Sequence, residues 1–445
     1  MVKGTKMKTL FQKIFLSLFS LATMPLFYSQ SNVVFKNINT NFDFQDLDKK
    51  LNFIKNESEE TRNITIGVIF YSQNKEKDID VKNLETIIKH YVGNPKIYWT
   101  YFQNEDEWFS GIQNLKNQNA EVILHLYETP VFLDQAKFEI DNLNFNFASF
   151  LDYISSQTGI LHFFSGEKNP KSAILTRFSV FSKTDDKKRL KNQILNSSLA
   201  FNLQNSGIVS SQLLVPKLRY KQNNDYKEAV IGYYPTIVVA SIFSQLSSSF
   251  DIITDLKQHN SMILAALYLS AKTEDNLDFS FNGLHAREGF GIVNFYESFR
   301  QLKSNKVKNY HFSGEFHFED FDLKEGQEIN VILLFDNFSQ IVKKGQTPFQ
   351  NIWNFITGFP LFINNKPISI EAQSSNLWNN FDIELEVWRG SWQKVTTANS
   401  KLTNFDRLHF KAFENGKYRI KVVSPNFDKK KNSTFVLATQ IQNFS

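Results

Sequence analysis

The chain has 445 residues, of which 42% are hydrophobic and 21% charged, and its formal net charge at pH 7 is +5. This balance predicts folded domains rather than general disorder, and the length predicts two of them. The absence of cysteine excludes disulfides, thiolate metal sites and a cysteine nucleophile, and because four lysines before residue 14 supply most of the excess charge, nothing indicates a nucleic-acid partner.

The N-terminus has the form of a secretory signal. A basic stretch, Lys3 to Lys13, precedes the mostly apolar run Ile14 to Phe27. The run is shorter than the roughly 20 residues of a membrane-spanning helix. Small residues around Ser29 and Ser31 suit cleavage, so residues 1–31 are a signal peptide or an uncleaved N-terminal anchor. We therefore expect an extracellular or cell-surface protein that meets the membrane only through this segment.

The next part of the chain alternates short β-rich runs with single helices. Strands are predicted at residues 64–70, 96–102, 121–127 and 159–164, and helices at 82–90, 107–118 and 147–157. Strands separated by one helix must be joined by crossovers, which gives a parallel sheet with helices on both faces. Residues 32–303 are therefore predicted to form a doubly wound α/β domain.

Two strongly apolar helices, 235–245 and 261–272, are predicted to be buried in this domain. After Lys303 the hydrophobic period becomes twofold, which places the domain boundary at 302–308. Strands are then predicted at residues 310–321, 328–335, 381–388, 405–413 and 418–423. Their spacing is typical of an antiparallel β-sandwich, assigned to residues 309–445.

Several segments resemble those of a known family. In chain order they are Phe164 to Glu167 (similar to "SAGN"), Leu213 to Pro216 ("xxAPG"), Ser261 to Ala271 ("xxIKAALxxSA") and Gly289 to Tyr296 ("GxGxVDxxxA"). Together they resemble the subtilisin-like serine peptidases in their mycoplasma form, over most of residues 64–300. Segments 381–388 and 415–422 resemble strands of β-sandwiches appended to secreted peptidases.

The resemblance implies a Ser nucleophile, a His base, an Asp that orients the His and an Asn in the oxyanion hole. The matching positions hold Phe70 for the Asp, Asp80 for the His, Ile231 for the Ser and Glu167 for the Asn, unless the last loop slips to Asn169. With these groups replaced, the resemblance implies a catalytically degenerate pseudopeptidase. A rival register keeps Ser248 as nucleophile, but it leaves too few residues before Leu267 for the expected elements.

Other constellations give weaker indications. His125 and His162 fall inside predicted strands and are expected to be core histidines. If residues 310–321 form one strand, His311, Glu315, His317 and Glu319 share one face with metal-ligand spacing. An ordinary solvated sandwich face explains the same pattern, so neither a metal nor another cofactor is predicted.

Three functions remain open. The preferred interpretation is a pseudopeptidase that binds a polypeptide or a partner subunit. Resemblance to mycoplasma immunoglobulin-cleaving peptidases implies immunoglobulin, or an immunoglobulin-binding surface protein, as that partner. The alternatives are an active serine endopeptidase that cleaves host proteins such as immunoglobulin, and a purely structural surface subunit.

Overall fold

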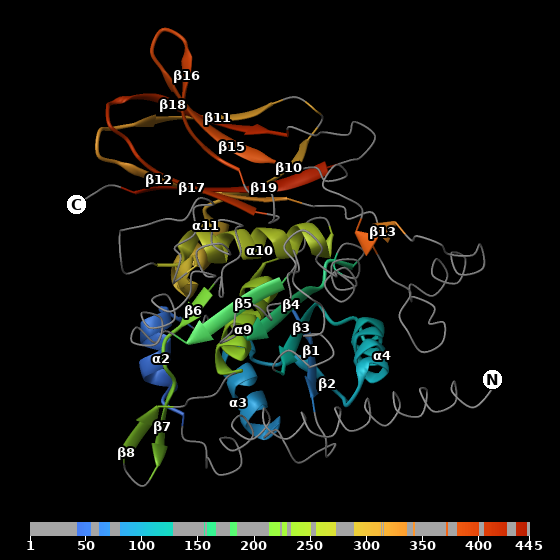
Figure 1. Ribbon diagram of the computed structural model, residues 1–445. Coiled ribbons are helices and arrows are strands. Elements are labelled where there is room, and N and C mark those ends of the chain that lie inside the picture. Colours follow the sequence, from blue (N-terminus) through green and yellow to red (C-terminus); the bar gives the residue numbers. More distant parts are fainter. Residues whose placement is uncertain are drawn as a thin grey trace, which may run out of the picture.

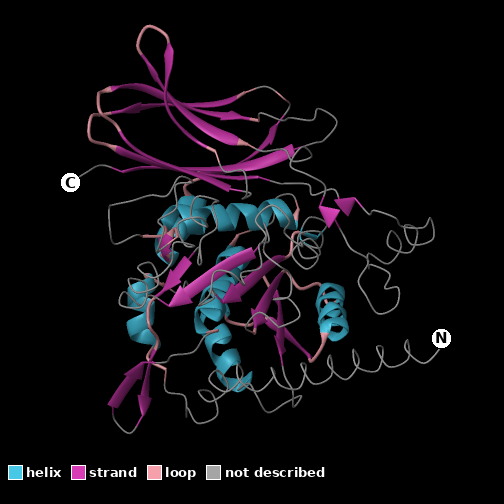
Figure 2. Cartoon of the chain, in the orientation of Figure 1, coloured by secondary structure: helices cyan, strands magenta, loops and turns pink. Residues whose placement is uncertain are grey.

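A parallel sheet fills one half of the molecule and a β-sandwich the other (Figures 1 and 2). The computed structural model describes residues 42–54, 62–71, 81–127, 155, 158–165, 179–184, 213–222, 225–228, 233–250, 255–272, 289–312, 314, 316–335, 341–342, 371–372, 381–399, 405–424 and 433–442. The N-terminal segment 1–31 and most of the predicted helix 147–157 lie outside these residues. Among the helices described, none is long and apolar enough to cross a membrane.

The parallel sheet has seven strands in the order β2-β1-β3-β4-β5-β6-β9, and every neighbouring pair is parallel. The strands are β1 (Thr65–Tyr71), β2 (Lys96–Phe102), β3 (Val122–Leu126), β4 (Leu161–Ser165), β5 (Ser179–Thr184), β6 (Leu213–Val215) and β9 (Gly291–Ile292). The prediction of a parallel sheet is confirmed. All four strands predicted before residue 165 are present, with ends shifted by at most two residues.

Helices cover both faces of this sheet. On one face, α3 (Val81–Val92) and α9 (Tyr234–Ser249) share a core with Ile66 and Val68 of β1. On the other face lies α4 (Glu105–Asn117), whose Gly111 packs closely on β1: an added Cβ would stand 3.1 Å from the Ile69 side chain. The helix α9 is buried along nearly its whole length, as its uniformly apolar sequence predicts.

The C-terminal part consists of two antiparallel sheets, ordered β10-β19-β12-β17 and β11-β18-β15-β16. Their strands are β10 (Val307–Phe312), β11 (His317–Leu323), β12 (Glu328–Phe335), β15 (Asp382–Trp388), β16 (Trp392–Ala398), β17 (Phe405–Lys411), β18 (Gly416–Val423) and β19 (Ser433–Gln442). Apolar side chains from both sheets meet in one core, so the predicted sandwich is present.

The first of these sheets is covered on both sides. Its outward face packs against α10 (Leu256–Ser270), which lies along it in Figure 1. Leu334 and Val436 therefore belong to the same buried cluster as Leu264 of α10. The helix α11 (Phe295–Lys303) packs beside α10 and leads into β10. The sandwich is thus built onto the α/β part through a continuous apolar layer.

Two smaller elements complete the α/β part. The helix α2 (Phe44–Leu51) begins at Asp43, whose carboxylate accepts a hydrogen bond from the Asp46 N–H at 3.1 Å. Strands β7 (Arg219–Gln222) and β8 (Asp225–Glu228) form a hairpin at the lower left of Figure 1, beside α2. A short two-stranded pair, β13 (Ile341–Val342) with β14 (Glu371–Ala372), lies apart from the three large sheets.

The single strand predicted at 310–321 is wrong. The chain turns at Gly314, whose φ of +95° is favourable only for glycine, and continues as β10 and β11 in different sheets. The twofold alternation runs across the turn in the sequence, so it does not reveal the break. Strands β16 and β19 were not anticipated.

Candidate functional site

The topology marks one edge of the parallel sheet as the place for a site. From β1 the chain passes to β2 on one side of β1 and then to β3 on its other side. The strand order therefore reverses between β1 and β3. In open α/β sheets ligands bind at the carboxyl ends of the strands beside such a switch point. Here those ends are Phe70–Tyr71 of β1 and Leu126–Tyr127 at the end of β3.

This edge is lined by aromatic rings. Phe70, at the position expected for an orienting Asp, is 5% exposed and packs within 6.3 Å, centroid to centroid, of Trp99 and Tyr101. The ring of Phe102 contacts Tyr71 at 5.5 Å and Tyr127 at 5.0 Å. No residue of β1 carries a carboxylate, so this strand offers hydrocarbon and phenol where a proton relay would need an acid.

A buried chain of polar groups begins at this edge and runs into the sheet. The indole N–H of Trp108 on α4 donates to the Tyr127 hydroxyl at 2.8 Å, and this hydroxyl lies 2.6 Å from Nδ1 of His125. Across β3 and β4, Nε2 of His125 lies 2.9 Å from Nδ1 of His162. The ring of Phe164 stacks on His125 at 4.1 Å, which shields this junction.

His125 and His162, the two histidines in this buried chain of polar groups, are neutral at physiological pH. Burial, and secondarily the neighbouring His162, hold the pKa of His125 well below its usual value. Burial alone lowers the pKa of His162 to about 3. In neutral imidazoles one nitrogen donates and the other accepts, so a proton on either His125 nitrogen fixes the tautomer of His162. Nε2 of His162 is buried and makes no hydrogen bond.

Ser248, the alternative nucleophile, lies near the C-terminal end of α9. It is 4% exposed, and its hydroxyl donates to the Gln245 carbonyl oxygen at 2.9 Å, one turn back in the same helix. The backbone oxygen of Ser248 accepts from the Arg62 N–H at 3.1 Å, and Arg62 precedes β1. Ser248 therefore lies at the amino ends of the strands, the edge opposite the switch-point site.

A serine–histidine contact does occur beside it. Ser247 Oγ lies 3.0 Å from Nε2 of His259 at the start of α10, and it accepts a hydrogen bond from Arg62 at 2.9 Å. The Arg62 guanidinium also binds both carboxylate oxygens of Glu121, at 2.8 and 2.6 Å. Burial and the Arg62 charge lower the pKa of His259. The group ties together the starts of β1 and β3, the end of α9 and the start of α10.

The other predicted site positions lie outside the described residues. Asp80 stands directly before α3, Glu167 follows β4, and Ile231 falls shortly before the first residue of α9. Their roles stay predictions. The helix α9 begins at Tyr234, with Pro235 in its first turn.

The remaining described histidines do not converge. His90 pairs with Asp48 at 2.9 Å, and His409 pairs with Glu328 at 3.2 Å. His311 lies on β10, whereas His317 and Glu319 lie on β11, and Glu315 falls outside the described residues. Within the described ranges no group of three or more histidine, aspartate or glutamate side chains could hold a metal ion.

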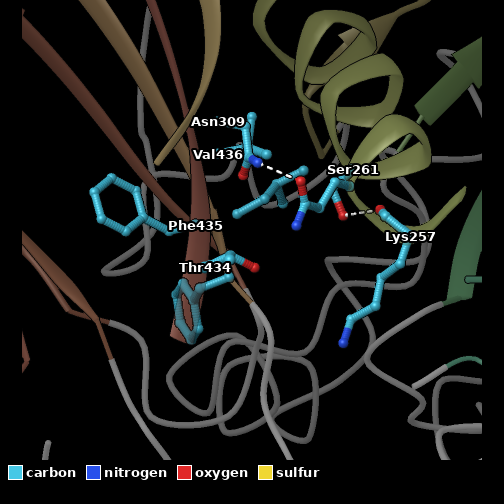
Figure 3. Close-up of a pocket in the computed structure, with 9 residues that line it drawn as sticks. Lys257, Ser261, Asn309, Thr434, Phe435 and Val436 are labelled. Carbon is cyan, nitrogen blue, oxygen red and sulfur yellow. Dashed lines mark hydrogen bonds between the residues drawn. The ribbon is translucent and has the colours of Figure 1, made fainter. Parts of the chain in front are cut away.

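A small pocket with a volume of about 10 Å³ opens at the junction of the two parts. Figure 3 shows Lys257 and Ser261 of α10 on one side and Asn309 and Phe435 of the sandwich on the other. The Asn309 amide donates to Gln258 at 2.6 Å and Ser261 donates to the Lys257 carbonyl oxygen at 2.8 Å. The pocket has room for about one water molecule, whereas a typical small-molecule site occupies roughly 300–1,000 Å³.

Sequence reasoning missed several of these residues. Trp108 and Tyr127 complete the buried chain of polar groups, and Arg62 and Glu121 form an ion pair at the amino ends of the strands. The available signal was position: Glu121 begins and Tyr127 ends the predicted strand 121–127, and Arg62 lies just before the predicted strand 64–70. Parallel strands bring such positions together at one edge.

No family model and no curated protein matches the sequence. Solved structures to which the chain is similar include a serine protease of Aeromonas sobria, at 8% identity and a TM-score of 0.35, with 86% of this chain and 89% of that chain covered. The Prenylagaramide maturation protease PagA aligns at 10% identity and a TM-score of 0.34, covering 54% of this chain and 94% of that chain. The pre-peptidase C-terminal domain of Bacillus anthracis collagenase aligns at 14% identity and a TM-score of 0.18, covering 30% and 87%. The fold is defined by the sheet order and strand register of the chain itself.

Proposed function

We propose that the chain is a catalytically inactive, subtilisin-like cell-surface protein that binds a polypeptide or a partner subunit. The observation that carries the proposal is the chemistry of the switch-point edge. Where the resemblance calls for an acid on β1, Phe70 is buried among Trp99 and Tyr101. Acyl transfer needs a base, a nucleophile and an orienting acid together, and loss of all three removes the route to an acyl-enzyme.

The placement of the serines supports the inactive form over the active alternative. The Ser248 hydroxyl donates to its own helix, and among the described residues no histidine contacts it. Ser247 has a histidine neighbour but is fully buried and accepts a hydrogen bond from Arg62. Burial, and secondarily the Arg62 guanidinium, lower the pKa of His259 and so disfavour its protonation, whereas a general base must take up a proton from its nucleophile.

The partner is proposed by resemblance. Peptidases of this type hold an extended peptide at the carboxyl edge of the sheet by strand addition, and an inactive relative keeps that grip without cutting. Resemblance to immunoglobulin-cleaving peptidases makes immunoglobulin the first candidate. The aromatic lining around Tyr71 supplies apolar contact area at low cost in side-chain entropy.

The test is to measure binding and cleavage in the same samples. Purified chain is passed over immobilised immunoglobulin G, and a parallel mixture is analysed on denaturing gels after prolonged incubation. We expect reversible binding with intact heavy and light chains, and weaker binding by Tyr71→Ala. The matched control is Tyr226→Ala, which removes a 62% exposed tyrosine on β8. Cleavage would favour the active peptidase. If the chain neither binds nor cleaves immunoglobulin G, immunoglobulin is excluded as the partner.

A further inference from the structure

The strand β2 forms one outer edge of the seven-stranded sheet. All seven of its residues, Lys96–Phe102, pair in continuous register with β1, and within the described ranges no strand pairs with its other side. The opposite edge strand, β9, has only two residues. The sheet therefore has one long edge at which a further strand could add.

The pairing with β1 fixes which backbone groups of β2 face outward. The Lys96 N–H donates to the Ile64 carbonyl oxygen at 2.9 Å, so the backbone groups of Lys96 point toward β1. Because direction alternates along a strand, those of Tyr98 and Thr100 point the same way, whereas those of Ile97 and Trp99 point away. Within the described part of the chain these outward N–H and C=O groups make no hydrogen bond.

Nothing in β2 protects this edge against pairing. Edge strands are usually blunted by proline, by bulges or by several charges, but β2 has no proline, a bulge-free register and one charged residue, Lys96. Its side chains are also unusually accessible for a parallel sheet: Tyr98 and Tyr101 are each 37% exposed, whereas β3 is buried throughout. The edge is long, free of bulges and rich in aromatic residues.

We propose that this edge pairs with the same edge of a second copy of the chain. In an antiparallel arrangement with the twofold axis at Tyr98, Ile97 of each copy faces Trp99 of the other. Ile97 and Trp99 have backbone groups that face the second copy, so each Ile97–Trp99 pair exchanges two hydrogen bonds. Between these two pairs, the two Tyr98 residues form a closer pair without hydrogen bonds. The two seven-stranded sheets join into one.

The features of β2 fit its own copy. The open groups of Ile97 and Trp99 are self-complementary, as an isologous interface requires. The side chains of Ile97 and Trp99 point to one face of the sheet, where Ile97 of each copy contacts Trp99 of the other. On the other face Lys96 lies opposite Thr100 of the second copy, so no two like charges are opposed.

The test is to measure the mass of the full chain in solution by sedimentation velocity. The concentration is varied over roughly a hundredfold range, because a small interface gives a weak dimer. We expect a monomer–dimer equilibrium that Ile97→Pro abolishes and Ile97→Val preserves. Proline at 97 removes an outward N–H and leaves the β1 ladder intact. Circular dichroism identifies any variant that fails to fold.

A second variant tests the position of the axis. Tyr98→Lys opposes two ammonium groups across the twofold axis while keeping every backbone group, so we expect dissociation at low salt and recovery at high salt. A protein that is monomeric at all concentrations would overturn the proposal. A dimer that survives both Ile97→Pro and Tyr98→Lys would overturn it as well, since the contact would then lie elsewhere.

Discussion

Ser247 Oγ lies 3.0 Å from Nε2 of His259, at the amino ends of β1 and β3. This is the contact that a serine hydrolase requires, but it occupies the edge of the sheet opposite the switch-point site. Ser247 is 0% exposed and His259 is 6% exposed, so no substrate carbonyl reaches the hydroxyl. Together with Arg62 and Glu121 the pair connects four elements. We interpret the cluster as structural.

The structural role predicts a stability effect. Ser247→Ala removes the hydroxyl that binds both Arg62 and His259. Arg62 keeps its two bonds to Glu121, and His259 keeps the Ser247 backbone oxygen at 3.2 Å. Each lost hydrogen bond costs about 0.5–1.5 kcal/mol of unfolding free energy. The matched control, Ser249→Ala, removes a partly buried hydroxyl bonded only to its own helix, and we expect a smaller loss. Urea unfolding followed by circular dichroism measures both. Equal losses would contradict the assigned role.

The buried histidine pair predicts a dependence of stability on pH. The folded-state pKa values of His125 and His162 lie below the usual value near 6.5, so below that pH the unfolded chain binds more protons than the folded one. Each group therefore lowers the unfolding free energy by about 1.4 kcal/mol per pH unit as the pH falls below about 6.5.

This prediction is checked by denaturant unfolding at a series of pH values. His162→Gln removes one of the two titrating groups, so we expect a shallower pH slope between about pH 6 and 5. His311→Gln, on the exposed surface of β10, is the matched control and should keep the wild-type slope. If His162→Gln and the control have the same slope, the buried pair does not govern acid stability.

Gly159 predicts a steric effect where β4 begins. Its φ is +78°, and an added Cβ would lie 2.5 Å from the backbone nitrogen of Lys257. Gly159→Ala therefore combines an unfavourable backbone conformation with a clash against α10, and we expect it to cost more than about 2 kcal/mol. Gly93→Ala has a similar φ of +77° but open space around the Cβ, so only the conformational part remains. Thermal unfolding of the two variants separates the contributions, and equal midpoints would refute the clash.

The layer between α10 and the sandwich predicts cooperative unfolding. Because Leu334 and Val436 share one buried cluster with Leu264, exposing either part uncovers apolar surface on the other. We expect a single calorimetric transition for the whole chain. Leu334→Ala, which truncates a 3% exposed side chain, should lower that one transition rather than split it. Two well-separated transitions in the unmodified chain would contradict the shared core.

Much of the fold is predictable from sequence because hydrophobic period reports burial directly. The strand Lys96–Phe102 and the strand Glu328–Phe335 are found at the predicted residues, and the apolar α9 is buried as expected. The break at Gly314 was missed because twofold alternation continues on both sides of it. The strand β19 was missed although its middle, Phe435 to Ala438, is buried.

The site was less predictable than the fold. The sequence places Phe70 at the end of its strand, but it does not show that Tyr127 and Trp108 converge with His125 on a relay. That convergence depends on α4 crossing the face opposite α9, which only the topology reveals. The serine–histidine contact joins residues 12 apart in sequence, one on α9 and one on α10, and no sequence motif indicates it.

The central claim, that no serine of this chain is an activated nucleophile, is tested most directly with a fluorophosphonate probe. Folded protein is incubated with the probe, and adducts are located by peptide mass spectrometry beside an active serine peptidase as positive control. We predict no adduct on any serine, Ser247 and Ser248 included. An adduct on Ser248 that disappears on denaturation and in Ser248→Ala would contradict the claim and establish the active peptidase.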